Sequence, residues 1–121
     1  MIKLQIPLLL VLVTGFLLGA MYLFQLLNPT LNSIQVLESN KEGTYLSPDG
    51  KKRITVYFNG GLIFFTDLSY IGVLEDLTTD SKKNLFLISP NVKEVQWINN
   101  EIIAVNGIEI NIDDTYDFRY E

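Results

Sequence analysis

The chain has 121 residues, of which 48% are hydrophobic, and it carries 9 Lys or Arg against 14 Asp or Glu, a formal net charge of −5 at pH 7. It contains neither Cys nor His, which excludes disulfide bonds, thiolate and histidine catalysis, and metal sites built on those two residue types. The acidic balance argues against nucleic-acid binding, because a phosphate backbone would be repelled.

The longest apolar stretch covers residues 4–27, carries no charge and is mainly Leu, Val, Ile and Phe. As a helix it would be about 36 Å long at about 1.5 Å per residue, enough to cross a hydrocarbon core of about 30 Å with some tilt. Residues 1–28 are therefore predicted to form a single transmembrane helix that acts as an uncleaved signal-anchor.

Two other interpretations of this stretch stay open. A signal peptide cut after Ala20 would have Leu18 where a small residue is favoured, and its apolar core would exceed the usual length of about 7–15 residues. A helix buried in a soluble protein would have to be covered on all sides, which the roughly 90 remaining residues can hardly do. The signal-anchor is the favoured interpretation.

Positive charges near the ends of the stretch predict its orientation. Lys3 and the α-amine precede it, whereas Glu38, Lys41 and Glu42 are the first charged residues after it. Because cytoplasmic flanks carry the excess of Lys and Arg, the N-terminus is expected inside. The remaining domain is then expected outside the cytoplasm, tethered to the cell membrane.

Gly15 and Gly19 form a Gly-x-x-x-Gly pair within this helix. Such spacing lets two helix backbones approach closely, so the pair is the candidate helix-packing site of a homodimer. The competing interpretation is that glycine is simply frequent in membrane helices.

The helix is expected to end at Asn28, because the residue before Pro29 disfavours helical geometry. Residues 29–42 are predicted to be a linker, either an extended tether or a short resumption of helix over residues 31–37. Residues 43–121 are predicted to be a small all-β domain.

Short runs of β-branched and aromatic residues, separated by Gly, Pro and Asn turns, predict the strands. A polar loop is expected over residues 78–84, and residues 62–66 and 70–74 form either one bent strand or two. The fold class is mainly β: six or seven short antiparallel strands in a meander, as a small sheet or half-open barrel. The segments expected to form them are residues 44–46, 54–58, 62–66 together with 70–74, 85–88, 95–98, 101–105 and 108–112.

The Asn106-Gly107 pair predicts a two-residue hairpin, because both residues tolerate the positive φ of a type I′ turn. This register pairs Val105 with Ile108 and Ile103 with Ile110. If Asn99-Asn100 is also a two-residue turn, Trp97 shares a face with Ile102 and Ala104. The opposite face is the predicted core, formed by Ile103, Val105, Ile108, Ile110 and Ile112.

Carboxylates are the only plentiful reactive groups. The sequence has neither the two facing carboxylates of a glycosidase nor the alternating oxygen ligands of a calcium-binding loop. No catalytic residue is therefore predicted, and most Asp and Glu residues are interpreted as solvated side chains in turns. If a cation binds, Asp113, Asp114 and Asp117 are the first candidates. No cofactor is expected.

Three aromatic residues are candidates for an interaction surface. Trp97 lies in an alternating strand, where a core or hairpin anchor is commoner than a sugar platform. Phe64 and Phe65 belong to the most apolar run of the domain, residues 62–65. That run is a central strand if both faces are covered, and a partner or membrane contact if one face is bare; the central strand is preferred.

Two parts of the β-rich region together look familiar. They are residues 45–51 with 56–61, and residues 95–98, 102–107 and 116–119. With an N-terminal membrane helix, this pattern resembles an uncharacterised family, a domain of unknown function, of small single-pass membrane-anchored β-rich proteins of Gram-positive bacteria. The resemblance covers most of residues 43–119 and departs after Gly61, where residues 62–65 are more apolar. It implies an architecture and no activity.

These features predict a non-enzymatic membrane-anchored protein whose acidic β-domain makes interactions outside the cytoplasm, with itself or with an envelope protein. The lipid bilayer is the expected partner of the helix. The alternative is a small-ligand binder or a carboxylate-based hydrolase at the cell envelope, which would need a concave pocket with converging polar groups.

Overall fold

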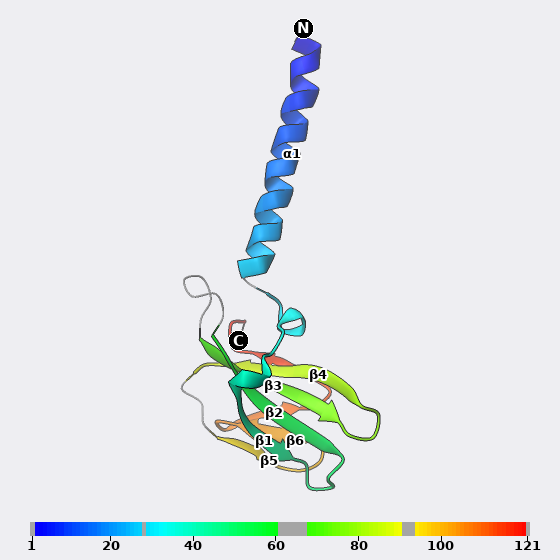
Figure 1. The fold of residues 1–121 in the computed structure, drawn as a ribbon, viewed down its shortest axis with the longest axis vertical. Coiled ribbons are helices and arrows are strands. Elements are labelled where there is room, and N and C mark those ends of the chain that lie inside the picture. The colour runs from blue at the N-terminus through cyan, green and yellow to red at the C-terminus, as the bar shows by residue number, and fades with distance from the viewer. Residues whose placement is uncertain (1, 28, 61–67, 91–93, 121) are drawn as a thin grey trace. The chain divides into compact units, whose positions relative to one another are not determined.

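The computed structural model describes residues 2–27, 29–60, 68–90 and 94–120, which belong to two compact units, Met1–Thr30 and Leu31–Glu121. The first unit contains α1 (Ile2–Leu27), a helix of 26 residues (Figure 1). Its window Pro7–Phe24 has a mean hydropathy of 2.2, and none of it is buried. The helix is therefore long and apolar enough to cross a membrane.

The second unit is built from strands. Two short 3₁₀ turns, η1 (Leu31–Ser33) and η2 (Glu38–Asn40), precede the first strand. In the described part of the unit, the strands form a five-stranded sheet of order β1-β2-β3-β4-β8 and a three-stranded sheet of order β5-β6-β7. The strands are β1 (Lys41–Leu46), β2 (Lys52–Asn59), β3 (Ser69–Asp76), β4 (Ser81–Ile88), β5 (Val95–Trp97), β6 (Ile102–Val105), β7 (Ile108–Asn111) and β8 (Tyr116–Asp117).

The predicted mainly β, antiparallel fold is confirmed, as two open sheets without barrel closure among the described strands. Neighbouring strands pair antiparallel except for β4 and β8, which run parallel. In Figure 1, β5 of the smaller sheet lies next to β1, and residues of both sheets form one buried core.

We call the side of the five-stranded sheet that faces the three-stranded sheet its inner face, and the opposite side its outer face. Side chains alternate between the two along each strand, as the pleat requires. Ile54 and Val56 of β2 therefore point into the inner core, whereas Tyr57 lies in the outer cluster. The inner core comprises Ile54, Val56, Leu74, Leu85, Phe86, Ile88, Ile103, Val105, Ile110 and Ile112.

Strands β2 and β3 are buried on both faces, because the outer face is also covered over part of its area. The four central residues of each strand, 54–57 and 71–74, are all buried. Both are interior strands of the five-stranded sheet. Residues 62–65, with Phe64 and Phe65, for which a central strand is predicted, lie outside the described residues.

The polar segment expected to be a loop over residues 78–84 is half strand. The turn ends at Asp80, and β4 begins at Ser81, where Lys82 pairs with Glu75 and Lys83 with Leu74. The expectation was wrong because the cross-strand pairs that support these polar residues cannot be read from their own segment.

The hairpin register at Asn106-Gly107 is confirmed: Val105 pairs with Ile108 and Ile103 with Ile110. Both turn residues have positive φ, 51° and 79°. Of the five positions predicted to be core, the prediction for Ile108 was wrong. This residue lies next to the turn and is 37% exposed. The other four are buried.

The predicted face of Trp97 was also wrong. Trp97 pairs with Ile103, not with Ile102, and packs against the inner core. The backbone N–H groups of Glu101 and Ile102 donate to Oδ1 of Asn99, which makes the connection longer than two residues. A register change of one residue moves a side chain to the opposite face.

Candidate functional site

The outer face of the five-stranded sheet receives the chain that follows the apolar helix. We call residues 31–37 the docking segment. Leu31 is 8% exposed, and Ile34 and Val36 are partly buried against the same cluster. Their partners on the sheet are Tyr57, Ile71, Val73 and Leu87. Part of the region expected to be a linker, residues 29–42, therefore packs on the domain.

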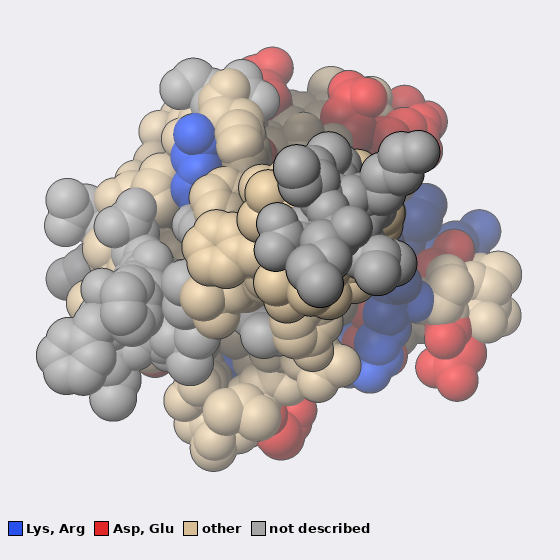
Figure 2. All heavy atoms as spheres, turned by 90° about the horizontal axis from the view of Figure 1, so that it is seen from above, with Lys and Arg blue, Asp and Glu red and all other residues tan. Residues whose placement is uncertain are grey.

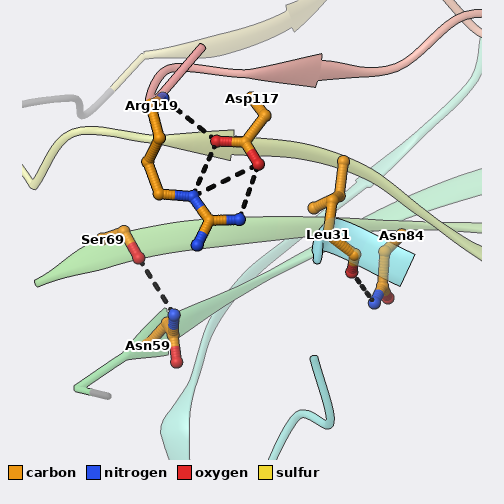
Figure 3. A network of polar contacts seen from close by, with 6 residues as sticks. All are labelled: Leu31, Asn59, Ser69, Asn84, Asp117 and Arg119. Carbon is orange, nitrogen blue, oxygen red and sulfur yellow. Dashed lines mark hydrogen bonds and ion pairs between the residues drawn. The ribbon is translucent and has the colours of Figure 1, made fainter. Parts of the chain in front are cut away.

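Asn84 fixes the docking segment to the sheet (Figure 3). Its Nδ2 donates to the carbonyl oxygen of Leu31 at 2.8 Å and to that of Ile34 at 2.9 Å. An amide nitrogen has two hydrogens, so both donors are used. Asn84 pairs with Val73 in β3, whose side chain belongs to the outer cluster, and this register aims the amide at the docking segment.

The C-terminal part of the chain reaches the same face. Phe118 packs against the outer cluster, and its N–H donates to the carbonyl oxygen of Leu87 at 3.0 Å. Next to it, Arg119 holds Asp117 in a two-pronged ion pair, with Nε 2.9 Å from Oδ1 and Nη2 2.7 Å from Oδ2 (Figure 3). The carboxylate of Asp117 is thereby occupied within its own turn.

Polar pairs lie on the outer face on either side of the apolar cluster. At one end, Nδ2 of Asn59 donates to Oγ of the buried Ser69 at 3.1 Å (Figure 3). At the other, Arg53 forms an ion pair with Glu75, its cross-strand neighbour. Burial raises the pKa of the Tyr57 hydroxyl between them, and the negative charges of Glu38 and Glu75 act in the same direction.

Two hollows flank the docking segment. One, of about 260 Å³, lies between its Ile34–Leu37 stretch and the end of β2, with Phe58 and Ile71 in its lining. The other is wider and more open, about 590 Å³, and is lined by Asn32, Ile34, Lys82, Lys83, Asn84 and Thr115. Nζ of Lys83 already donates to the carbonyl oxygen of Ile112 at 2.8 Å. Leu37 beside the smaller hollow is 62% exposed.

The three candidate metal ligands are not brought together as a ligand set. Within the described residues, no group of three or more acidic side chains could hold a metal ion. Asp113 and Asp114 are exposed, and their N–H groups donate to Oδ1 and O of Asn111 in a turn. Asp117 is held by Arg119, as described above.

Two other acidic side chains, Asp49 and Asp76, accept hydrogen bonds within tight turns. Oδ1 of Asp49 accepts from the N–H of Lys51 and the hydroxyl of Ser47, and these bonds lower the pKa of the carboxyl. Oδ1 of Asp76 accepts from the hydroxyl and the N–H of Thr78, which likewise lower its pKa. Both carboxylates stabilise the turns in which they lie.

Trp97 joins the two sheets. Its Nε1 donates to the carbonyl oxygen of Tyr45 in β1 at 3.0 Å, and its ring packs against the inner core. This bond uses one of the backbone acceptors that the edge strand β1 would otherwise present. The placement gives Trp97 a structural role as a link between the two sheets.

Gly15 and Gly19 lie four residues apart in α1. A Cβ added at either position would meet no atom within 4 Å, so the two glycines leave an open notch on the helix surface. The remaining aromatic candidates, Phe64 and Phe65, are not described.

The charge of the second unit is unevenly divided along the chain. Residues 31–90 carry six basic and seven acidic residues, whereas residues 94–114 carry five acidic residues and no Lys or Arg. The acidic stretch forms the three-stranded sheet and its connections. Residues 31–90 carry charges of both signs. Figure 2 shows Lys and Arg side chains among Asp and Glu along one side of the view.

Sequence reasoning missed the docking segment and Asn84. Leu31 looked like one of several scattered aliphatic residues, and Asn84 like the end of a polar loop. The available signal was the position of Asn84 directly before the apolar run 85–88, which makes it a strand residue with a polar side chain.

Comparison with known proteins places the chain in a family. Residues 2–121 match the model of a family described as a family of unknown function, DUF5412, and the chain belongs to this family. The resemblance to an uncharacterised family that the sequence motifs indicated is thereby confirmed. No curated protein and no solved structure matched the chain.

Proposed function

We propose that this protein is a single-pass membrane protein whose helix α1 anchors an extracytoplasmic β-domain, and that the domain acts as an interaction module. The observation that carries the proposal is the helix itself. Between Pro7 and Phe24 its large apolar side chains are 47–77% exposed, so this surface has a lipid environment as its natural solvent.

The orientation rests on the charges that flank the helix. Lys3 precedes it, and the sequence between Leu27 and Glu38 contains no charged residue. The side with the nearby positive charge is retained in the cytoplasm, which sends the β-domain across the membrane.

The use of the carboxylates supports an interaction role over catalysis. Asp49 and Asp76 accept hydrogen bonds within their turns, and Asp117 and Glu75 are held by Arg119 and Arg53. A pair that works as acid and base would instead face one substrate position. The partner we propose is a protein of the cell envelope or a second copy of this chain.

Cysteine labelling tests the anchor and its orientation together, because the natural chain has no Cys. Gln96→Cys places a thiol on the exposed side of β5, and Lys3→Cys places one before the helix. In intact cells, a membrane-impermeant maleimide should label the first variant, and the second only after permeabilisation. The reverse pattern overturns the orientation. Release of the full chain by alkaline carbonate without detergent overturns the anchor.

Anchor exchange tests the interaction role in a strain with a measurable deletion phenotype. Replacing residues 1–30 with an unrelated signal-anchor of the same orientation should preserve function, whereas deleting them should abolish it. Asp113→Asn and Asp114→Asn should each preserve it. A folded, membrane-bound variant that loses all function through one such carboxyl change would overturn the proposal in favour of a catalytic or ligand-binding role.

A further inference from the structure

We propose that Asn106 is a site of spontaneous chemical modification, at which the side-chain amide is converted to a carboxylate through a cyclic imide formed with Gly107. The reaction needs no enzyme, and water is its only co-reactant. The inference concerns the β-domain alone and does not depend on the membrane anchor.

The chemistry uses atoms that are adjacent in the chain. The backbone nitrogen of Gly107 attacks Cγ of Asn106, and the bond from Cγ to the amide nitrogen breaks. Ammonia leaves with the proton of the backbone nitrogen. Water then opens the five-membered ring, at Cγ to give Asp or at the main-chain carbonyl carbon to give isoaspartate. Glycine favours ring closure because it has no Cβ to crowd the attacking nitrogen.

The sequence contains two Asn-Gly steps, Asn59-Gly60 and Asn106-Gly107, and the fold holds them differently. Asn59 is the last residue of β2, is half-buried and pairs with Ser69 of β3. Its Nδ2 donates to Oγ of this buried serine at 3.1 Å. Ring closure at Asn59 would break that hydrogen bond and disturb the end of the strand pairing.

The Asn106 side chain is held more loosely. Asn106 and Gly107 form the two-residue turn between β6 and β7, and both are exposed. Oδ1 of Asn106 accepts from the N–H of Glu94 at 3.4 Å, beyond the usual range of about 2.7–3.2 Å. Opening this turn disturbs only the end of one hairpin, and such local openings cost less than global unfolding. The side-chain amide can therefore reach the backbone nitrogen of the glycine.

Other asparagine side chains of the β-domain take part in shorter hydrogen bonds. Both hydrogens of Nδ2 in Asn84 are donated, and the Oδ1 atoms of Asn99, Asn100 and Asn111 accept backbone N–H groups at 2.8–2.9 Å. None of these four residues is followed by glycine. Asn106 thus combines a favourable next residue, exposure and a weakly bound amide.

Both products would disturb the hairpin. Val95 pairs with Val105, and the N–H of Asn106 donates to the carbonyl oxygen of Glu94 at 2.9 Å, so residues 94 and 106 lie opposite each other. A carboxylate on residue 106 would face the acidic Glu94, and like charges directly opposite destabilise a sheet. Isoaspartate also adds an atom to the main chain between Val105 and Ile108, where a two-residue turn sets the register.

Peptide mapping by mass spectrometry measures conversion at both Asn-Gly steps, because replacement of NH₂ by OH raises the mass of the peptide. The full chain is incubated in detergent at mildly alkaline pH, once folded and once in urea. In the folded chain, Asn106 should convert severalfold faster than Asn59, and in urea the two rates should converge. Equal rates in the folded chain, faster conversion of Asn59, or a gap that persists in urea overturns the inference.

Two variants test the chemistry and the protection separately. Asn106→Gln keeps an amide but moves its carbonyl one carbon farther from the backbone nitrogen, so conversion at residue 106 should fall severalfold. Ser69→Ala removes the acceptor that holds the Asn59 amide. It should speed conversion at residue 59 and leave residue 106 at the parent rate. Unchanged conversion at residue 106 in Asn106→Gln, or at residue 59 in Ser69→Ala, overturns the corresponding step of the argument.

Discussion

Gly72 and Phe86 are cross-strand partners in β3 and β4, and the Phe86 ring occupies the volume that a side chain on residue 72 would need. A Cβ built on Gly72 would overlap Cζ of Phe86, whose side chain is fully buried. The register shifts between Gly72 and Val73, so Leu85 and Phe86 both enter the inner core. The glycine thus makes room for the central aromatic residue of the domain.

Gly72→Ala should destabilise the domain by about 1–3 kcal/mol or prevent its folding, because the added Cβ would overlap a fully buried ring that must then shift. Urea unfolding of the full chain in detergent, followed by the fluorescence of the single Trp, measures this change. Gly60→Ala is the matched control, since its Cβ would meet only Phe58 Cε1 at an ordinary 3.5 Å. Equal midpoints for the two variants would refute the packing argument.

Trp97→Phe should lower the free energy of unfolding by about 1 kcal/mol through loss of its hydrogen bond to the Tyr45 carbonyl, with a further loss from the smaller ring. Circular dichroism must follow unfolding here, because the variant has no Trp. Gln96→Ala, on the exposed side of the same strand, should stay within about 0.5 kcal/mol of the parent. A Trp97→Phe variant as stable as Gln96→Ala would show that the link between the sheets is not needed.

The lowered pKa of Asp76 gives a pH-dependent contribution to stability. A carboxyl whose pKa falls below 3.8 on folding stabilises the native state above that pH, and the contribution is lost as the pH falls through the folded pKa. Thr78→Val removes the hydroxyl donor, so the Asp76 pKa should rise toward 3.8 in a carboxyl NMR titration. Thr79→Val should leave it nearly unchanged, because the Thr79 hydroxyl contacts Ser81 instead. Equal shifts in both variants would contradict this assignment.

Gly15 and Gly19 predict a helix–helix contact in the membrane. The double variant Gly15→Ile and Gly19→Ile fills the notch and should reduce dimerisation severalfold in a two-hybrid assay for membrane helices. The control variant, Val13→Ile with Leu17→Ile, replaces two apolar side chains by others of similar size. Each position lies two residues before one of the glycines, and dimerisation should stay near the parent level. A parent helix that shows no dimer signal, or a double variant that keeps it, would argue against the pairing.

The sequence predicted structure well where a local signal was sufficient. The Asn106-Gly107 pair set its hairpin register because its positive φ values favour one turn geometry. The helix α1 was predicted equally well, because the hydropathy of one continuous stretch is enough to identify it.

Prediction failed where a side chain binds backbone groups, either within its own turn or far along the chain. The side chain of Asn99 binds two N–H groups and lengthens its turn, which moved Trp97 to the other face. Asn84 lies more than fifty residues from its acceptor Leu31. No pattern within the docking segment or within β4 predicts that contact, so the docking segment could be identified only from the folded structure.

The shared cluster of Leu31 and Phe118 has a consequence for how the protein is made. The first and the last parts of the β-domain complete the same patch, and β8 closes the sheet beside β4. A ribosome delivers Leu31 long before Phe118, so the outer cluster cannot be completed until Phe118 has been synthesised. If the helix anchors the chain as proposed, it enters the membrane while the β-domain is still incomplete, and an incomplete domain is the state that can be threaded across a bilayer.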